Sequence, residues 1–138
     1  MADPGARAMS GAAAALRAAA MAALEEAEPI GAVYPGPPIQ AALPYAVVEC
    51  GPELDWSHKG RRGRELRLAV TVRAGGETPE RIQTLAAAAE AALEALPHPA
   101  EWSLVGLVFL RSRCVADARG GDPGWAAVIE YRARMLAA

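Results

Sequence analysis

The two histidines, His58 and His98, are the first side chains to consider for acid–base or metal chemistry. His98 stands between two prolines, which is typical of a solvated turn. His58 stands beside a cationic run, which disfavours both its protonation and the binding of a metal cation. No spacing of histidines and carboxylates resembles a zinc or two-metal site. The sequence therefore predicts no metal site, no cofactor and no histidine-based catalysis.

The two cysteines, Cys50 and Cys114, are the candidate nucleophiles. Their spacing matches no metal or redox motif. Both fall in predicted strands, where buried free thiols are common, so a disulfide between neighbouring strands is the less favoured alternative. A nucleophilic cysteine needs a positioned base, and nothing in the sequence nominates one. An enzyme that uses either thiol is thus a disfavoured alternative, and we expect no catalytic residues.

Two glycine pairs and two aspartates fall in predicted turns. The pairs at 75–76 and 120–121 precede no Lys-Ser/Thr and form no phosphate-binding motif, so they are interpreted as turn glycines. Asp117 and Asp122 flank the second pair, but two carboxylates without further oxygen ligands are too few for calcium. We therefore interpret this segment as a turn capped by aspartate.

One aromatic and four basic side chains gather in and just after a glycine-flanked loop, Gly51–Gly63. These candidate contact residues are Trp56, Lys59, Arg61, Arg62 and Arg64. The loop has three interpretations: it grips phosphates and stacks on bases, it is a solvated connection, or it docks on an acidic protein surface. The chain carries a net charge of −2 and has no second basic cluster, whereas nucleic-acid binding needs several phosphate contacts. Protein contact is the favoured interpretation.

The composition indicates a single domain, residues 1–138, without a membrane segment. A single lysine stands against thirteen arginines, which we interpret as a coding bias that weakens arginine as evidence for bidentate recognition. The alanine-rich stretch before Leu24 resembles a signal peptide, but Arg17 interrupts it and it is too short to span a bilayer. We expect synthesis in the bacterial cytoplasm.

The central positioning elements are a strand and the helix that follows it. Residues 65–73 alternate between apolar and polar side chains, which predicts a strand with one apolar face. Residues 78–96 begin with Thr78-Pro79-Glu80, a predicted capped helix start, and continue with apolar residues at three- and four-residue steps. Pro97 ends that helix.

The N-terminal half contributes one helix, an arm and a strand. Residues 1–10 are expected to be a loose start, and 11–27 form an alanine-rich helix whose thin apolar stripe needs a packing partner. Prolines in 29–44 exclude a central strand and predict an extended arm or edge segment. Residues 43–50 read as the first full strand.

The C-terminal segment predicts a β-hairpin. Residues 101–116 are apolar on both faces, which predicts a strand covered on both sides, by the 78–96 helix and by either the first helix or a partner subunit. Residues 125–135 alternate again. The fold class is therefore α+β, with a mostly antiparallel four-stranded sheet, an N-terminal and a central helix packed on it, and a closing β-hairpin.

The order of elements resembles the tail-completion (tail terminator) family of long-tailed phages and gene transfer agents. The pieces that carry the resemblance are the N-terminal Ala/Leu helix, Val33-Tyr34-Pro35-Gly36-Pro37-Pro38, Leu43-Pro44-Tyr45-Ala46-Val47, Asp55-Trp56-Ser57 and Gly63-Arg64-Glu65-Leu66-Arg67-Leu68, then the central helix and the closing hairpin. No single piece is specific for this family, but the combination of the pieces in a chain of this length is.

The resemblance implies a structural virion protein and not an enzyme. Such proteins form a hexameric ring at the head-proximal end of the tail, end tail-tube growth and seat the head-side connector. The implied partners are identical copies, the tail-tube protein and the head-side connector or stopper, while DNA passes through the lumen without specific binding. We expect the 51–63 loop and the 29–44 arm, with Tyr34 and Pro37, to make the partner contacts.

Two further alternatives remain open. One is a small ligand-binding or regulatory α+β domain with a pocket between sheet and helix, although the apolar strand faces offer few convergent polar groups. The other is a different virion protein, either a tail-tube subunit or the head-side stopper.

Overall fold

The structure, a computed structural model, describes residues 11–138. Its elements in chain order are α2 (Ala12–Glu25), the short 3-10 helix η1 (Glu28–Ile30), β1 (Ala32–Tyr34), β2 (Tyr45–Asp55), β3 (Gly63–Gly75), α3 (Glu80–Glu94), β4 (Trp102–Ala116) and β5 (Gly124–Ala137). The α+β class and the closing β4–β5 hairpin are confirmed. The loose start expected for 1–10 lies outside the described residues.

Within residues 11–138 the sheet has five strands, in the order β1-β2-β3-β5-β4, and not the expected four. The extra strand, β1, comes from the proline-rich arm and pairs parallel with the first residues of β2, from Tyr45 to Val47. All other pairings are antiparallel. A strand so short, at the edge, fits a segment in which prolines remove hydrogen-bond donors. The sheet is therefore mixed.

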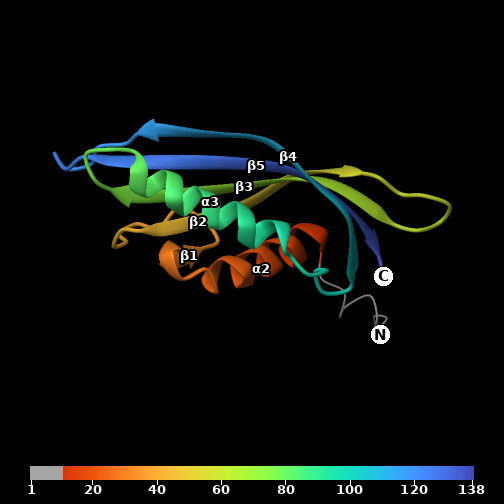
Figure 1. The fold of residues 1–138 in the computed structure, drawn as a ribbon. Coiled ribbons are helices and arrows are strands. Elements are labelled where there is room, and N and C mark those ends of the chain that lie inside the picture. Colours follow the sequence, from red (N-terminus) through yellow and green to blue (C-terminus); the bar gives the residue numbers. More distant parts are fainter. Residues whose placement is uncertain (1–10) are drawn as a thin grey trace.

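Both helices pack on the same face of the sheet, α2 over β2 and α3 over β3 and β5 (Figure 1). The alternating residues of β3 and β5 point into this layer and are buried there: Leu66, Leu68, Val70 and Val72 from β3, and Ile129, Tyr131, Ala133 and Met135 from β5. From α2, Leu16 and Leu24 are both 0% exposed. Burial of one such side chain contributes about 1.5–3 kcal/mol, which explains how a helix with a thin apolar stripe is stable here.

The helix α3 starts two residues later than expected. Its N-cap is Pro79, and no side chain caps the first turn, so the predicted capping by Thr78 is wrong. Proline fixes a backbone angle suited to a helix start, and Glu80 supplies the favourable negative charge in the first turn. The helix therefore begins without a capping hydroxyl.

The strand β4 is not covered by the first helix, as one alternative had it, because α2 lies over β2 at the opposite side of the sheet. It is an edge strand, and Val105 (54% exposed) and Phe109 (46% exposed) are open to solvent. Register shifts between Leu104 and Gly106 and between Phe109 and Arg111 interrupt its alternation. A bulge turns residues out of the regular pattern, so apolar residues appear on both faces. Cover by a partner subunit stays a prediction.

The two cysteines are free thiols. Cys50 belongs to β2 and Cys114 to β4, which lie at opposite sides of the sheet with β3 and β5 between them. The interpretation as free thiols is confirmed, but the expected burial is wrong for Cys114, which is exposed, and Cys50 is only half-buried.

Candidate assembly interface

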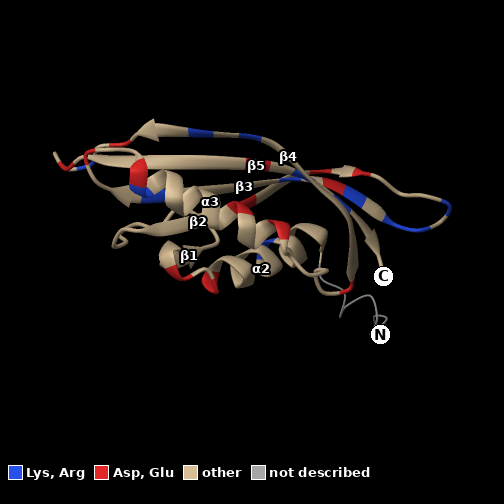
Figure 2. Ribbon diagram, in the orientation of Figure 1, with Lys and Arg blue, Asp and Glu red and all other residues tan. Residues whose placement is uncertain are grey.

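The predicted loop 51–63 is mostly β-structure: β2 continues to Asp55, β3 begins at Gly63, and together they form a hairpin that projects beyond the rest of the sheet (Figure 1). We call residues 55–63 the hairpin tip. It narrows to a two-residue turn at Lys59 and Gly60, whose φ angles are +46° and +79°. Two positive φ angles match the twist of the flanking strands, and glycine adopts the second without cost. Lysine and arginine cluster at this end of the molecule (Figure 2).

Backbone and side-chain hydrogen bonds hold the hairpin tip in one shape. The amides of His58 and Arg61 donate to each other's carbonyls, at 2.9 and 2.7 Å. The Ser57 hydroxyl donates to Asp55 Oδ1 at 2.6 Å and accepts from the amide of Gly63 at 3.0 Å. The hydrogen bonds from Ser57 lower the pKa of the Asp55 carboxyl. These hydrogen bonds give the tip a defined shape, while most of its residues remain exposed.

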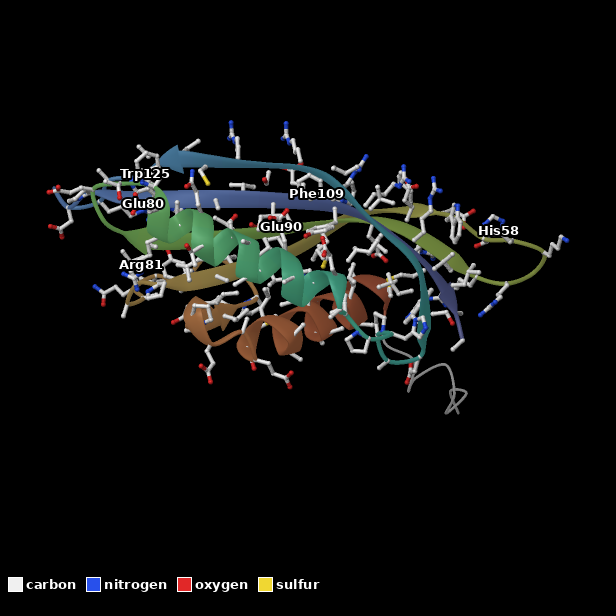
Figure 3. All side chains as sticks on the ribbon, viewed as in Figure 1. His58, Glu80, Arg81, Glu90, Phe109 and Trp125 are labelled. Carbon is white, nitrogen blue, oxygen red and sulfur yellow. The ribbon has the colours of Figure 1, made fainter. Side chains whose placement is uncertain are left out.

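Trp56 is the aromatic centre of the tip. Its indole meets the His58 ring edge-on, with 4.4 Å between ring centroids and an interplanar angle of 89°. On β5, the Arg134 guanidinium lies 5.4 Å from the indole centroid, a cation–π distance. The same guanidinium donates to Glu65 Oε1 at 2.9 Å. Trp56 is thus fixed against the sheet rather than free to stack on a base. In Figure 3 the label His58 marks the end of the molecule that carries the hairpin tip.

All three predicted contact arginines make contacts within the chain. Arg64 Nη1 donates to the carbonyl of Gly63 at 3.0 Å and lies 3.7 Å from Asp55 Oδ1. Arg61 Nε donates to the carbonyl of Ala137 at 2.8 Å, and the Ala137 amide donates to the carbonyl of Arg62 at 2.8 Å. The Arg62 guanidinium lies over the buried Trp102 ring, 5.6 Å from its centroid. These contacts join the tip to the last residues of β5 and the first residue of β4. Lys59 is exposed at the turn itself.

The arm residues lie far from the tip. Tyr34 belongs to β1 and meets Tyr45 edge-on, with 5.8 Å between ring centroids. Pro37 borders a shallow hollow of about 100 Å³, on the sheet face away from the helices, together with Tyr45 and Arg119. Tyr45 begins β2 and Asp55 ends it, a separation of about 30 Å at the usual rise per residue. The predicted contact residues therefore form two separate surfaces.

The sequence interpretation missed the edge of β4 as a surface in its own right. Its exposed apolar side chains are Val105, Val108, Phe109, Leu110 and Val115. Phe109, labelled in Figure 3, meets Tyr131 edge-on, with 5.8 Å between ring centroids. The signal was present, since the run is apolar on both faces, but the same pattern also describes a strand covered on both sides.

Comparison with known proteins gives one family. The family described as tail completion protein gp17 matches residues 15–136. This chain belongs to that family. Among solved structures, a chain of the "Virion of native gene transfer agent (GTA) particle" is similar, with a TM-score of 0.62 and 30% identity, over 92% of this chain and 99% of that one. Among curated proteins, no sequence matches. Membership makes this family member a structural protein of a phage-like tail.

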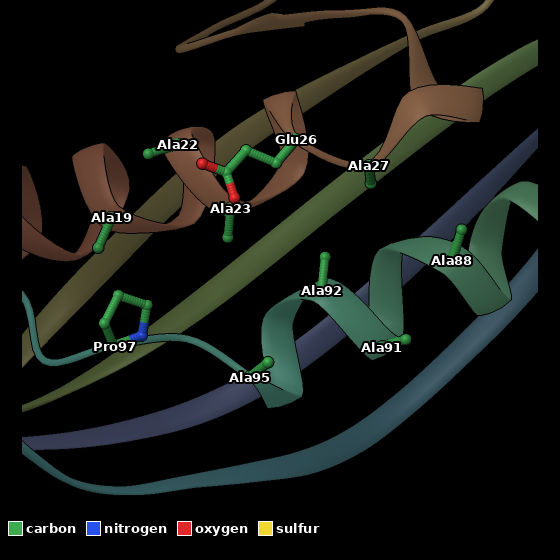
Figure 4. A pocket seen from close by; sticks show the side chains of 10 residues that line it. All are labelled: Ala19, Ala22, Ala23, Glu26, Ala27, Ala88, Ala91, Ala92, Ala95 and Pro97. Carbon is green, nitrogen blue, oxygen red and sulfur yellow. The ribbon is translucent and has the colours of Figure 1, made fainter.

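A hollow of about 490 Å³ lies between α2 and α3 of this tail completion protein (Figure 4). Alanines and Pro97 line it, and Glu26 is its single charged residue. A ligand pocket needs several convergent polar groups, so the hollow does not favour the ligand-binding alternative. Within residues 11–138, no three His, Cys, Asp or Glu side chains are placed to hold a metal ion. None of the described helices is long and apolar enough to cross a bilayer.

Proposed function

We propose that this chain forms a ring at the head-proximal end of a phage-like tail, where it ends growth of the tail tube and seats the head-side connector. The observation that carries the proposal is the match to the tail completion family over residues 15–136. The similar solved chain comes from a gene transfer agent virion, which supports a place in an assembled particle. Identical neighbours would also cover the open apolar edge of β4.

The hairpin tip is the segment that we assign to the adjoining protein ring. It projects from the sheet, and hydrogen bonds fix its shape, so docking orders no flexible loop. Arg61 and Arg62 contact β5 and Trp102, so both side chains are held against the sheet. Lys59 at the turn, with Trp56 and Arg64 behind it, is the part that meets an acidic partner. Tyr34 and Pro37, at the other end of β2, then face a neighbouring copy.

Genetic complementation tests this function. In cells that lack the gene, we expect unjoined heads and tails of irregular length in electron micrographs, and wild-type protein should restore normal particles. Lys59→Glu reverses the charge at the turn without removing an anchoring contact, so a folded protein should fail to join heads to tails. Arg81→Glu, an exposed change on α3, is the matched control and should complement. Normal particles without the gene would refute the function.

Electron microscopy of the purified protein separates the terminator from its nearest rivals. A terminator forms discrete rings, because its two faces differ and stacking stops after one layer. Tubes that stack without limit would instead identify a tail-tube subunit. Normal head joining by the Lys59→Glu protein would remove the role assigned to the hairpin tip and leave the ring untouched.

A further inference from the structure

Two strand edges of the sheet lack partners within the described chain. At one side, β1 covers only Tyr45–Val47 of β2, so Val48–Asp55 have no strand on their outer side. At the other side, β4 pairs only with β5. A long, apolar, unpaired edge is a ready site for pairing with another chain. β4 has fifteen residues, five of which expose large apolar side chains.

The two edges carry opposite charges. The charged residues of β4 are Arg111 and Arg113, both exposed, and the strand contains no acidic residue. Arg111 also donates to the Glu130 carboxylate of β5 at 3.0 and 3.2 Å and stays 70% exposed in its side chain. The charged residues of β2 are Glu49, Glu53 and Asp55, all exposed, and the strand contains no basic residue. Two β4 edges brought together would place arginines close to arginines, and two β2 edges would place carboxylates together. Opposite charges favour contact between β4 and β2.

The unpaired residues of β2, Val48–Asp55, lie at the same position along the strand direction as the apolar residues of β4. Glu49 pairs with Ala69, Ala69 with Glu130, and Glu130 with Arg111. By the same steps, Glu53 is level with Leu107, through Leu66 and Ala133. If a second copy is related to the first by rotation about an axis parallel to the strands, Glu49 of one copy comes opposite Arg111 of the other without a shift along the strands.

The strand directions also fit. The three pairings from β2 to β3, β5 and β4 are all antiparallel, so β2 and β4 run in opposite directions. Copies related by rotation keep these directions and meet as an antiparallel pair. Because the two edges differ, each copy offers one of each to its neighbours, and such a head-to-tail contact closes into a ring. Pro52 has no amide hydrogen, so the new ladder is interrupted there.

We propose that β4 of one copy pairs antiparallel with Val48–Asp55 of β2 in the next copy, with Arg111 opposite Glu49, and that a continuous sheet runs around the ring. This inference rests on the proposed ring and names its interface. It assigns the exposed apolar residues of β4 to contact between identical copies and not to the tail tube or the connector.

Cysteine cross-linking tests the pairing. In a Cys50→Ser, Cys114→Ser background, the pair Glu49→Cys with Arg111→Cys places one thiol on each edge. Mild oxidation of the purified protein should give a ladder of covalent oligomers on non-reducing gels, since every copy can bond to two neighbours. Each single variant should stay monomeric under the same oxidation. The pair Glu49→Cys with Arg81→Cys, whose second thiol lies on α3, is the matched control and should give no ladder.

A second variant tests the apolar contact. Val108 and Leu110 are 44% and 39% exposed, so Val108→Lys with Leu110→Lys should leave the fold intact, checked by circular dichroism. Light scattering should show association at least about tenfold weaker than that of the wild type, because two charges are added to an edge that must pair. Asp122→Lys, at the tip of the β4–β5 turn, is the control and should associate normally.

Three results would overturn the pairing. Covalent dimers from Arg111→Cys alone would indicate a two-fold β4–β4 contact. Rings that form normally while the Glu49–Arg111 pair gives no ladder would place the interface elsewhere, with the proposed function intact. A wild-type chain that stays monomeric at millimolar concentration, with no cross-linking, would also overturn it. The opposite combination is also informative. If the Glu49→Cys, Arg111→Cys protein gives the covalent ladder but cells lacking the gene still make normal particles, the function is refuted and the interface stands.

Discussion

Arg134 on β5 lies over the indole of Trp56, with 5.4 Å between the guanidinium carbon and the ring centroid. Its Nε also donates to Glu65 Oε1 at 2.9 Å, so one side chain connects the sheet and the hairpin tip. The tip therefore keeps a fixed direction relative to the sheet. A fixed projection suits a protein whose partners must meet it in one orientation.

Arg134→Ala should destabilise the protein by about 1 kcal/mol, since cation–π contacts and partly exposed ion pairs each contribute about 0.2–1 kcal/mol. Urea unfolding followed by tryptophan fluorescence measures both the loss and the release of Trp56. Arg134→Lys keeps the charge but loses the planar fork, so an intermediate loss is expected. Arg81→Ala, at an exposed position on α3, is the control. An Arg134→Ala protein as stable as this control would contradict the anchoring role.

Gly63→Ala should unfold at a clearly lower urea concentration, with a cost of about 1–3 kcal/mol typical of overpacking. A Cβ on Gly63 would collide with the carbonyl oxygen of Trp56 and lie 2.8 Å from Leu136 Cδ2. The backbone oxygen cannot move away, because the Trp56 amide already donates to the carbonyl of Gly63 at 3.0 Å. Gly36→Ala, where nothing lies within 4 Å of the new atom, should be neutral. Equal stabilities for the two variants would contradict the close approach.

The elements that could be predicted are those with one buried face. In β3 and β5 a period of two separates the helix-covered face from the open face, so both strands were predicted to within three residues at each end. β1 was not predicted as a strand, because three residues between prolines carry no period. Its pairing depends on where the arm crosses β2, which is a tertiary contact.

The candidate surfaces were predictable in part. The basic and aromatic residues of the tip were found by type, but their internal contacts were not. Arg61 and Arg134 meet partners seventy-six and seventy-eight residues away, at Ala137 and Trp56, and no local pattern encodes such distances. For β4, the apolar run indicates only that another element or another subunit covers the strand. Whether the cover comes from the same chain depends on the strand order.

The two thiols should differ in reactivity. Burial raises the pKa of the Cys50 thiol to about 11, opposed by nearby Arg17 and reinforced by Glu53. Cys114 is exposed. Because the thiolate is the reactive form, a disulfide reagent at pH 8 should modify Cys114 at least about tenfold faster than Cys50. Measured in dilute solution, where β4 is uncovered, Cys114→Ser should abolish only the fast phase. A fast phase that survives this substitution would contradict the assignment.

Tyr131→Phe should stabilise the protein at neutral pH. The Tyr131 hydroxyl is buried and has no hydrogen-bond partner among the described residues, a state that costs about 1–3 kcal/mol. Phenylalanine removes this oxygen and keeps the edge-on contact with Phe109, so a gain of up to about 1 kcal/mol is expected. Tyr34→Phe, at a half-exposed ring, is the control and should change little. A clear loss of stability at pH 7 would show that the hydroxyl has a partner.

The same substitution predicts a change in alkaline stability. Burial, reinforced by Glu90 and Glu94 on α3, raises the pKa of Tyr131 from 10.0 to about 12. Between these values the unfolded chain loses this proton before the folded one, so the wild type loses stability as pH rises from 10 toward 12. Tyr131→Phe removes this contribution, and its advantage over the wild type should be larger at pH 11 than at pH 7. Unfolding curves at the two pH values measure it, and an advantage that shrinks with rising pH would contradict a buried, neutral tyrosine.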